Sequence, residues 1–374
     1  MKIVIVGTSH PYRGGIAAFT DRLAAEFAKE GVDIEVVTFK LQYPSFLFPG
    51  KTQYSDAKSP EGFLIERKVN SINPLNWIKV GKEIRKKNPD IVIFTYWMPF
   101  FAPCFGKIAR LIKKNRHSKC IGLIHNMIPH EKSVLDKMLP PYFVKAMDGF
   151  VALSQSVLDD VASLDKQGKS KCMVPHPLYD HYGETMERSE VLKYLNLDPN
   201  YRYFLFFGLV RAYKGLDLLI DAFADERLRQ YNVKLIVAGE FYDDEKPYLE
   251  QIKKRGIDDL VIIKNQYIND NNVKYYFNVA DIVVQPYKSA TQSGVTQVAY
   301  HFEKPILVTN VGGLGEIIPD GKVGYVVDPN PSDIADALVD FCENGRYDAL
   351  VEGVRDEKQK YQWSNMTAAI QNLL

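Results

Sequence analysis

Short, continuous apolar runs alternate with helical patterns along the whole chain. Apolar runs occupy residues 2–7, 33–39, 90–97, 119–126 and 149–154 of the first half, and 203–208, 233–239, 260–265, 281–286, 305–310 and 324–328 of the second. Such runs of Val and Ile, without alternation, are typical of parallel strands that helices cover on both faces. The pattern therefore predicts an α/β fold with parallel sheets.

The segments between these runs carry helical spacing. Phe19, Leu23 and Phe27, for example, recur every four residues after the first run. Helices are also expected at 73–88, 105–115, 215–228, 246–256, 270–280, 295–302, 331–344 and 353–374. The series of strands and helices runs twice, which predicts two doubly wound domains, 1–180 and 190–356, with a linker rich in Pro, His and Tyr between them.

The composition is that of an ordinary globular protein. The chain has 374 residues, 46% hydrophobic and 25% charged, and its net charge of +1 gives no global case for a nucleic-acid partner. The four cysteines are far apart in sequence, which argues against a disulfide scaffold or a zinc cluster and suits a reducing cytosol. The first residues resemble a strand rather than a signal peptide, so we expect a cytoplasmic protein.

Two candidate sites of the first half follow predicted strands, where open parallel sheets bind ligands. Gly14 and Gly15 open a helix, so their amides are candidates for an anion; the alternative is a turn that needs glycine for its backbone. His125 ends the strand at 119–124, as a ligand contact or as a structural histidine. The spacing of His130 and Glu131 is not that of a metal site, and no metal is assigned.

The second half places two cations directly after a strand. Gly208 ends the strand, and Arg211 and Lys214 lie in the turn before a helix. At a helix start these charges can converge on one anion, which predicts a phosphate clamp rather than two solvated charges. Gly239 and Glu240 follow the next strand, where Glu240 is a candidate to bind a hydroxyl or to shape the loop.

The segment "SATQSGVTQ" (289–297) lies between a strand and a helix and carries no charge. Thr291 or Ser293 is expected to cap the helix. With Arg211 and Lys214 in the same domain, the helix start is better interpreted as a second group of amides that face a diphosphate. The candidate donor contacts are Thr291, Gln292, Ser293, Gly294 and Gln297.

Several of these motifs together resemble one family. The chain is similar to the GT-B-fold nucleotide-sugar glycosyltransferases of the family 4 type (glycosyl transferases group 1). The matching motifs are the paired glycines after the first strand, "FFGLVRAYKGLDLLIDAF", "LIVAGE", "VADIVVQPY" and "EKPILVTNVGGLGEII". They cover most of 203–330 in order, whereas the first half matches only at Gly14–Gly15, at His125 and at "VALSQSV".

The resemblance implies a fold and a reaction. Two Rossmann-like domains would face a cleft, and a last helix, 357–374, would return to the first domain. The second domain would bind a nucleotide-diphosphate sugar through Arg211 and Lys214. Gly15 would approach the phosphates or the sugar, and His125 would lie near the reacting carbon. Transfer to a glycan or lipid-linked acceptor, as in polysaccharide biosynthesis, is expected with retention and without a metal or other cofactor.

One motif of the family is replaced. Alignment on Pro286 and Pro305 puts Ala290 and Val298 where relatives carry the paired glutamates of the E-x7-E motif. Neither side chain accepts a hydrogen bond. Two alternatives to a transferase therefore stay open: a GT-B nucleotide-sugar-binding protein without catalysis, and a nucleotide-sugar epimerase.

A basic stretch of the first half suggests a second partner. Between Lys79 and Lys119 the only acids are Glu83 and Asp90. Basic helices beside "YPSFLFP" (43–49) are a candidate surface for peripheral contact with the anionic inner face of a membrane, where a lipid-linked acceptor would lie. The alternative is a pair of solvated helix faces.

Overall fold

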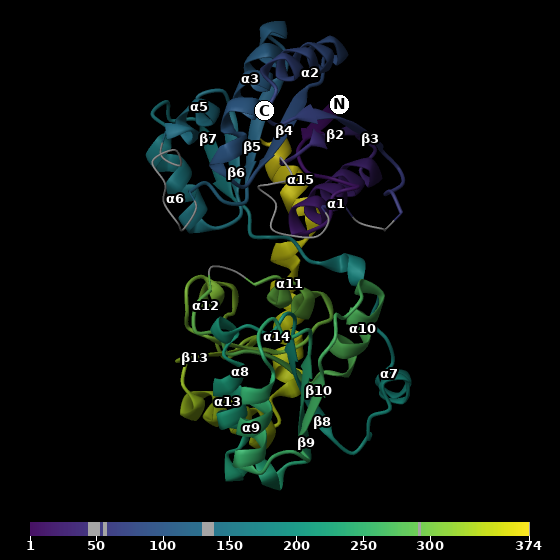
Figure 1. Cartoon of the computed structure of the whole chain (residues 1–374), viewed down its shortest axis with the longest axis vertical. Helices are drawn as coiled ribbons and strands as arrows, with labels where there is room; N and C mark the ends of the chain where they lie inside the picture. Colours follow the sequence, from purple (N-terminus) through teal and green to yellow (C-terminus); the bar gives the residue numbers. More distant parts are fainter. Residues whose placement is uncertain (44–52, 55–57, 129–137, 291–292, 374) are drawn as a thin grey trace. The chain divides into compact units, whose positions relative to one another are not determined.

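The computed structural model describes residues 1–43, 53–54, 58–128, 138–290 and 293–373. The chain divides into two compact units, shown in Figure 1. Unit 1 holds Met1–His176 together with Gln362–Leu374, and unit 2 holds Pro177–Tyr361. From the sequence, the first boundary was predicted between 180 and 190, and the return of the chain to the first domain was predicted at 357.

Unit 1 is a seven-stranded sheet of order β3-β2-β1-β4-β5-β6-β7, in which every strand pair is parallel. Its strands are β1 (Lys2–Val6), β2 (Asp33–Leu41), β3 (Leu64–Asn70), β4 (Ile91–Tyr96), β5 (Lys119–Ile124), β6 (Gly149–Ala152) and β7 (Ser170–Met173). Its helices are α1 (Gly15–Lys29), α2 (Pro74–Lys87), α3 (Ala102–Ile112), α5 (Pro140–Val144), α6 (Gln155–Leu164) and α15 (Trp363–Gln371). The order reverses beside β1, as in doubly wound folds.

Alternate residues of the central strands enter two different cores. In β1, Val4 and Val6 pack with α2, α3 and α5, whereas Ile3 and Ile5 pack with α1 and α15. Because both faces of the sheet are covered, both sets of side chains are apolar. This is the physical origin of the continuous apolar runs in the sequence.

Unit 2 is a six-stranded parallel sheet of order β10-β9-β8-β11-β12-β13. Its strands are β8 (Arg202–Phe207), β9 (Val233–Ala238), β10 (Val261–Lys264), β11 (Ile282–Gln285), β12 (Ile306–Thr309) and β13 (Gly324–Val327). Its helices are α7 (Arg188–Leu195), α8 (Leu216–Phe223), α9 (Lys246–Arg255), α10 (Asp270–Val279), α11 (Gly294–His301), α12 (Leu314–Ile317), α13 (Pro331–Glu343) and α14 (Tyr347–Lys358). Two cores again cover the two faces of the sheet.

The C-terminal segment corrects one prediction. The sequence pattern predicts a single helix over 353–374, but the structure breaks it between α14 and α15, where Gln362 is extended. Tyr361 is buried in the core of unit 2, whereas Trp363 is buried in the core of unit 1. Tyr361 and Trp363 are only two residues apart but are buried in the cores of different units. One continuous helix would not allow this, so the chain is extended at Gln362. None of the described helices is both long and apolar enough to cross a bilayer.

Candidate functional site

Three strand ends of unit 2 meet so closely that glycine is required. Gly239 follows β9, and a Cβ placed there would lie 2.1 Å from the carbonyl oxygen of Gly208, which follows β8. Gly215 has a φ of 68°, and its Cβ would lie 1.9 Å from the carbonyl oxygen of Pro286, which follows β11. The tight packing of these turns brings the predicted site residues to one edge of the sheet.

Arg211 and Lys214 lie together on this edge. Arg211 precedes a single 3-10 turn, Ala212–Lys214, and Gly215 then begins α8. The Arg211 guanidinium stacks on the ring of Tyr242 at 3.9 Å, and its buried Nε has no hydrogen-bond partner among the described residues. Neither cation forms an ion pair with a described carboxylate. The two residues predicted to form a phosphate clamp are therefore neighbouring cations that no described acid neutralises.

The ammonium group of Lys214 is in an unfavourable environment. The residue is buried, with 9% of its surface exposed, and its Nζ lies 5.6 Å from the centre of the Tyr287 ring. Burial, and then the nearby charge of Arg211, lower the pKa of Lys214 to about 8. An anion bound between the two cations would relieve both effects.

The start of α11 lies after β11, and no described side chain caps it. Ser293 occupies the N-cap position, but its hydroxyl is hydrogen-bonded to the Tyr287 hydroxyl at 3.3 Å and caps nothing. The prediction that Ser293 caps this helix is therefore wrong, because Tyr287 engages the hydroxyl. Thr291 and Gln292 lie outside the described residues. An uncapped helix start offers its first amides to an anion.

The structure distinguishes Gln297 from its neighbour Val298 on α11. Val298 is buried in the apolar core of unit 2, and Ala290 packs against that core. Gln297 is 2% exposed, and its Oε1 has no hydrogen-bond partner among the described residues. An orphaned buried acceptor is costly, so Gln297 is the acceptor that this part of the helix offers.

Glu240 is held by its backbone rather than by its side chain. Its carbonyl oxygen accepts from the Val210 amide at 2.8 Å, which joins the loops after β8 and β9. The residue is exposed, and its carboxylate has no partner within the described part of the chain. Glu240 thus shapes the loop and remains open to a ligand hydroxyl.

In unit 1, the two glycines open α1. Gly14 has a φ of 108° and is the N-cap of α1, again without a side-chain cap, and both Gly14 and Gly15 are exposed. The preceding loop is fixed by Asp21 of α1, which accepts from the Ser9 hydroxyl and from the His10 amide at 3.2 Å. Burial raises the pKa of Asp21 to about 6.

His125 directly follows β5 in unit 1. Its ring lies 4.7 Å from that of Phe19 at nearly a right angle, and its buried Nε2 has no hydrogen-bond partner among the described residues. Burial, and then the charge of His176, lower the pKa of His125 to about 3. The imidazole is therefore neutral at physiological pH. An Nε2 without a described partner is available to a ligand, as the prediction of a ligand contact requires.

Two aromatic residues at the unit 2 site were not predicted. Tyr242 stacks on Arg211, and Tyr287 borders Lys214 and binds Ser293. Tyr242 lies two residues after Glu240, beyond the end of β9, and Tyr287 lies two residues after Gln285, the last residue of β11. Both places are strand ends, where ligands were expected. An aromatic side chain beside a strand-end cation is the signal that would have found them.

No group of three or more His, Cys, Asp or Glu side chains in the described part of the chain is arranged to hold a metal ion.

Comparisons with known proteins match both units. The family model described as Glycosyltransferase Family 4 matches residues 13–178, and the model described as Glycosyl transferases group 1 matches residues 187–357. The D-inositol 3-phosphate glycosyltransferase of Arthrobacter sp. (strain FB24) is 31% identical in an alignment of 363 positions, gaps included, that covers 87% of this chain and 82% of the relative. The O-antigen chain mannosyltransferase C of Escherichia coli is 24% identical, covering 88% of this chain and 85% of the relative.

Solved structures share the fold. The structure of Anabaena HepE in complex with UDP has a TM-score of 0.71 at 15% identity, covering 100% of this chain and 99% of that one. Sucrose-phosphate synthase from Thermosynechococcus elongatus has a TM-score of 0.69 at 14% identity, covering 100% and 98%.

Two doubly wound parallel-sheet units and these likenesses define a glycosyltransferase with the GT-B fold. The chain belongs to the group 1 glycosyltransferases of the family 4 type.

Proposed function

We propose that the protein transfers a sugar from a nucleotide-diphosphate sugar to a hydroxyl group of an acceptor, with retention and without a metal ion. The observation that carries this proposal is the pair of Arg211 and Lys214, two neighbouring cations without a described acid partner. The start of α11, which no described side chain caps, supports it, since helix amides and cations both stabilise phosphate.

In the proposed step, the bond from the anomeric carbon to the diphosphate oxygen breaks. The acceptor oxygen forms its new bond to that carbon on the same face of the sugar, and a phosphate oxygen of the donor takes the proton. Charge develops on the departing diphosphate, which Arg211 and Lys214 stabilise. No protein nucleophile is required.

The remaining candidate residues supply orientation. Gln297 would accept a hydrogen bond from a donor hydroxyl, because its buried Oε1 is free among the described residues. His125 of unit 1 would contact the sugar as a neutral imidazole, since its pKa lies near 3. The exposed amides of Gly14 and Gly15 at the start of α1 would approach the phosphates or the sugar.

The names of similar proteins guide the choice of substrates. One solved structure of the same fold is a complex of HepE with UDP-glucose, and another is a lipopolysaccharide outer core galactosyltransferase. Curated relatives include the O-antigen chain mannosyltransferase. We therefore propose a nucleotide-sugar donor and a glycan or lipid-linked acceptor of polysaccharide biosynthesis, met at the cytoplasmic face of a membrane.

A thermal-shift panel of UDP-, GDP- and ADP-sugars identifies the donor. A ligand at about 100 times its dissociation constant adds roughly 2.7 kcal/mol to the free energy of unfolding, which the assay detects. Product configuration, read from the anomeric NMR signals of donor and product, tests retention. Transfer that stops in EDTA and returns with a divalent cation would contradict metal independence.

Arg211→Ala combined with Lys214→Ala is expected to abolish transfer. A charge-assisted hydrogen bond to the diphosphate is worth about 1.5–3 kcal/mol, so removal of both cations should lower donor affinity by about 100-fold or more. Isothermal titration calorimetry with the donor and initial rates of transfer measure these effects.

Lys253→Ala with Lys254→Ala is the matched control, because it removes the same charge from the exposed end of α9 in the same unit. Transfer by the Arg211/Lys214 variant at the rate of this control would refute the assignment of the site.

The burial of Val298 favours one other candidate, a nucleotide-sugar-binding protein without catalysis. Slow hydrolysis of the bound donor in the absence of acceptor would exclude it. Conversion of the donor into an isomeric nucleotide sugar, again without acceptor, would instead show an epimerase.

A further inference from the structure

Helices α2 and α3 of unit 1 each present a stripe of cations. On α2, Leu75, Lys79, Lys82 and Lys86 are all exposed and recur at helical spacing, so they lie on one face. On α3 and the 3-10 turn that follows it, the same spacing gives Pro103, Lys107, Arg110 and Lys114. Each stripe begins with an apolar residue and continues with three cations.

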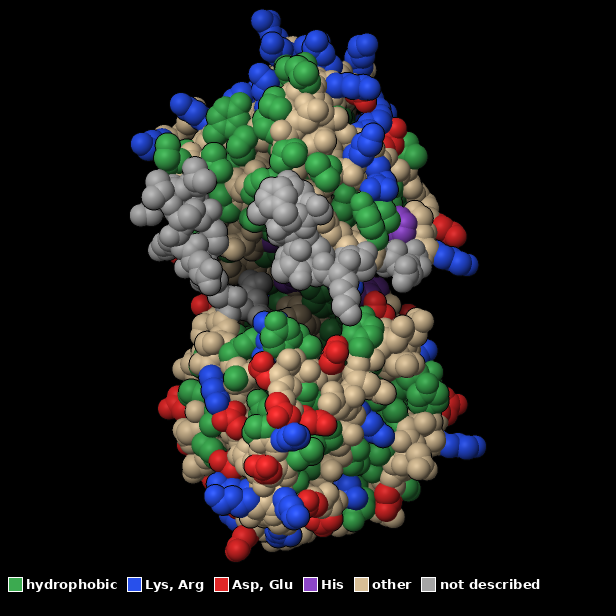
Figure 2. All heavy atoms as spheres, in the orientation of Figure 1, with side chains coloured by type: hydrophobic (Ala, Val, Ile, Leu, Met, Phe, Trp, Pro, Cys, Tyr) green, Lys and Arg blue, Asp and Glu red, His purple; other side chains and the backbone are tan. Residues whose placement is uncertain are grey.

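The two stripes lie side by side. A Cβ on Gly81 of α2 would lie 2.9 Å from the Cβ of Leu111 on α3, so the helices are in close contact at this glycine. Both helices connect parallel strands, and both therefore begin at the carboxyl edge of the sheet. The α2–α3 face, defined here as these two stripes, is thus apolar at that edge and basic beyond it. Figure 2 shows Lys and Arg side chains gathered at the top of unit 1, where Figure 1 labels α2 and α3.

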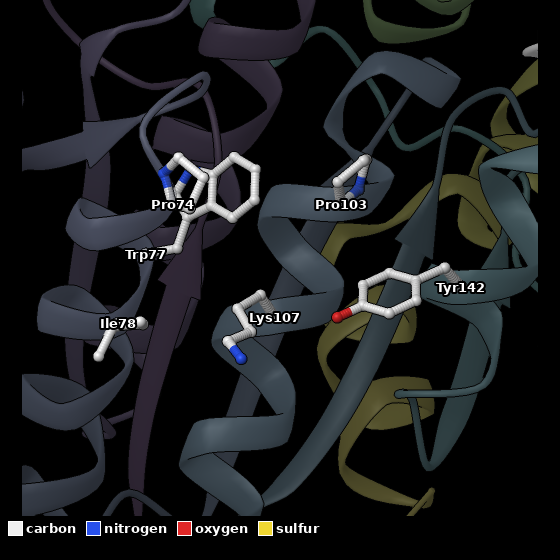
Figure 3. Close-up of a pocket in the computed structure, with 6 residues that line it drawn as sticks. All are labelled: Pro74, Trp77, Ile78, Pro103, Lys107 and Tyr142. Atoms are coloured by element: carbon white, nitrogen blue, oxygen red, sulfur yellow. The ribbon is translucent and has the colours of Figure 1, made fainter.

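The apolar end of the face is hollowed. A groove of about 290 Å³ opens between α2, α3 and α5, lined by Pro74, Trp77, Ile78, Pro103, Lys107 and Tyr142. In Figure 3, Pro74, Trp77 and Ile78 line the α2 side, and the Tyr142 hydroxyl points toward Lys107. Leu75 and Ile72, beside the groove, are 77% and 49% exposed. With the apolar lining of the groove they form a patch, and such a patch, unlike a single exposed apolar side chain, is typical of a surface that meets an apolar partner.

The cations of the face are not neutralised by described acids. None of the six has a carboxylate within ion-pair distance among the residues that the structure describes. The acids of this stretch are engaged elsewhere: Glu83 pairs with Lys68 at 3.2 Å, and Asp90 with His117 at 2.8 Å. Arg110 donates to the carbonyl oxygens of Gly106 and Tyr142. Because carbonyl groups carry no net charge, these hydrogen bonds do not neutralise the guanidinium. The face carries positive charge toward an anionic partner.

We propose that the α2–α3 face docks on an anionic lipid surface, with Leu75, Trp77 and the groove entering the headgroup region. Cations beside exposed apolar side chains match the two attractions of such a surface, headgroup charge and acyl chains. A nucleic-acid partner would use the cations alone and leave Leu75 and Ile72 without a role. This inference rests on the proposed function and adds to it the surface that would bring the enzyme to a lipid-linked acceptor. His125 lies at the same carboxyl edge of the sheet as the apolar end of the face, so an acceptor held in the membrane would be near it.

Vesicle co-sedimentation tests the proposal with the full chain. The protein is expected to bind phosphatidylcholine vesicles that contain phosphatidylglycerol, to ignore vesicles of phosphatidylcholine alone, and to dissociate as salt is raised. Lys79→Glu, Lys82→Glu and Lys86→Glu together should weaken binding by about 100-fold or more, since each basic residue contributes about fivefold. Leu75→Ser should weaken it several-fold without changing its salt dependence.

The controls are matched in charge and in exposure. Lys246→Glu, Lys253→Glu and Lys254→Glu change the net charge equally on α9 of unit 2, and Leu249→Ser removes an exposed leucine of that helix. Both should bind vesicles as the wild type does. Equal loss in the two triple variants, or absence of binding at low salt, would overturn the proposal.

Donor binding separates this inference from the proposed function. The Lys79/Lys82/Lys86 variant should keep the thermal shift given by the donor, because that site is in unit 2. If the wild type bound anionic vesicles but no nucleotide sugar, the proposed function would fail and the docking surface would stand.

Discussion

Lys214 is a single residue whose position costs the folded chain stability. Its ammonium group is buried beside another cation, and the free energy of keeping it charged there lowers its pKa to about 8. Against an ordinary value of 10.5, this difference corresponds to about 3 kcal/mol at most. Lys214 combines this cost with a place after a strand end and beside Arg211, and that combination is typical of a ligand site.

Lys214→Met is expected to stabilise the protein while it weakens donor binding by about tenfold or more. Removal of the buried charge should raise the free energy of unfolding by about 1–3 kcal/mol at pH 7. The folded pKa lies below the unfolded one, so the cost is complete below pH 8 and declines as the pH rises toward 10.5. The gain from the variant should therefore shrink by about 2 kcal/mol between pH 7 and pH 9.5, as measured by urea unfolding.

Lys304→Met is the matched control for donor binding. Lys304 is also buried, and its pKa is likewise lowered to about 8, but its Nζ donates to the carbonyl oxygen of Asn278 at 3.0 Å. It precedes β12 and thus lies at the amino edge of the sheet, away from Arg211. Donor affinity that falls equally in both variants would contradict the role of Lys214.

The sequence predicted the places of Arg211 and Lys214 in the fold better than the hydrogen bonds around them. Arg211 and Lys214 could be found because strand ends in parallel sheets are known from apolar runs alone. The orientation of a side chain depends on packing by residues distant in sequence. For that reason the engagement of Ser293 by Tyr287 and the stacking of Tyr242 on Arg211 appeared only in the structure.

At the scale of elements, Gly215 is where α8 meets the turn after β11. Its φ of 68° requires a left-handed backbone, and any Cβ would collide with the carbonyl oxygen of Pro286. Gly215 directly follows Lys214, and Pro286 begins the segment that leads to α11. The contact between Gly215 and Pro286 therefore determines how far Lys214 lies from the start of α11.

Gly215→Ala should destabilise the protein and weaken donor binding together. Gly256→Ala is its control, since Gly256 has nearly the same φ, 63°, with no heavy atom within 4 Å of its Cβ. The control isolates the backbone strain, which costs about 1–2 kcal/mol. Chemical unfolding should show a larger loss of stability for Gly215→Ala, and only this variant should lower donor affinity in calorimetry. Equal effects in the two variants would mean that the close approach to Pro286 is not important.

Two of the elements missed from the sequence pattern are the edge strands of unit 1, and the short helices α5, α6, α7 and α12 were missed as well. The central strands were found because both of their faces are buried. β3 (LIERKVN) and β7 (SKCM) lie at the two edges of the unit 1 sheet and carry polar side chains toward solvent. Their pairing is determined by the neighbouring strand rather than by their own hydrophobicity, so no apolar run reveals them.

At the scale of the molecule, the two ends of the chain build one unit. α15 packs on α1, and both contribute to the core on one face of the unit 1 sheet. Trp363 lies 5.0 Å from Phe19, the guanidinium of Arg22 lies 5.1 Å from the Trp363 ring, and Thr367 donates to Glu30. Unit 1 therefore cannot complete its core until the last residues of the chain are present.

Trp363→Ala should consequently destabilise unit 1 although it lies near the end of the chain. Trp363 is 4% exposed, and truncation of a buried Trp costs about 3–5 kcal/mol. Phe277→Ala in the core of unit 2 is the reciprocal variant. In calorimetry with donor present, Trp363→Ala should lower a transition that the donor does not shift, whereas Phe277→Ala should lower the one that it does. A donor-induced shift that disappears in the Trp363 variant alone would mean that unit 2 does not hold the nucleotide by itself.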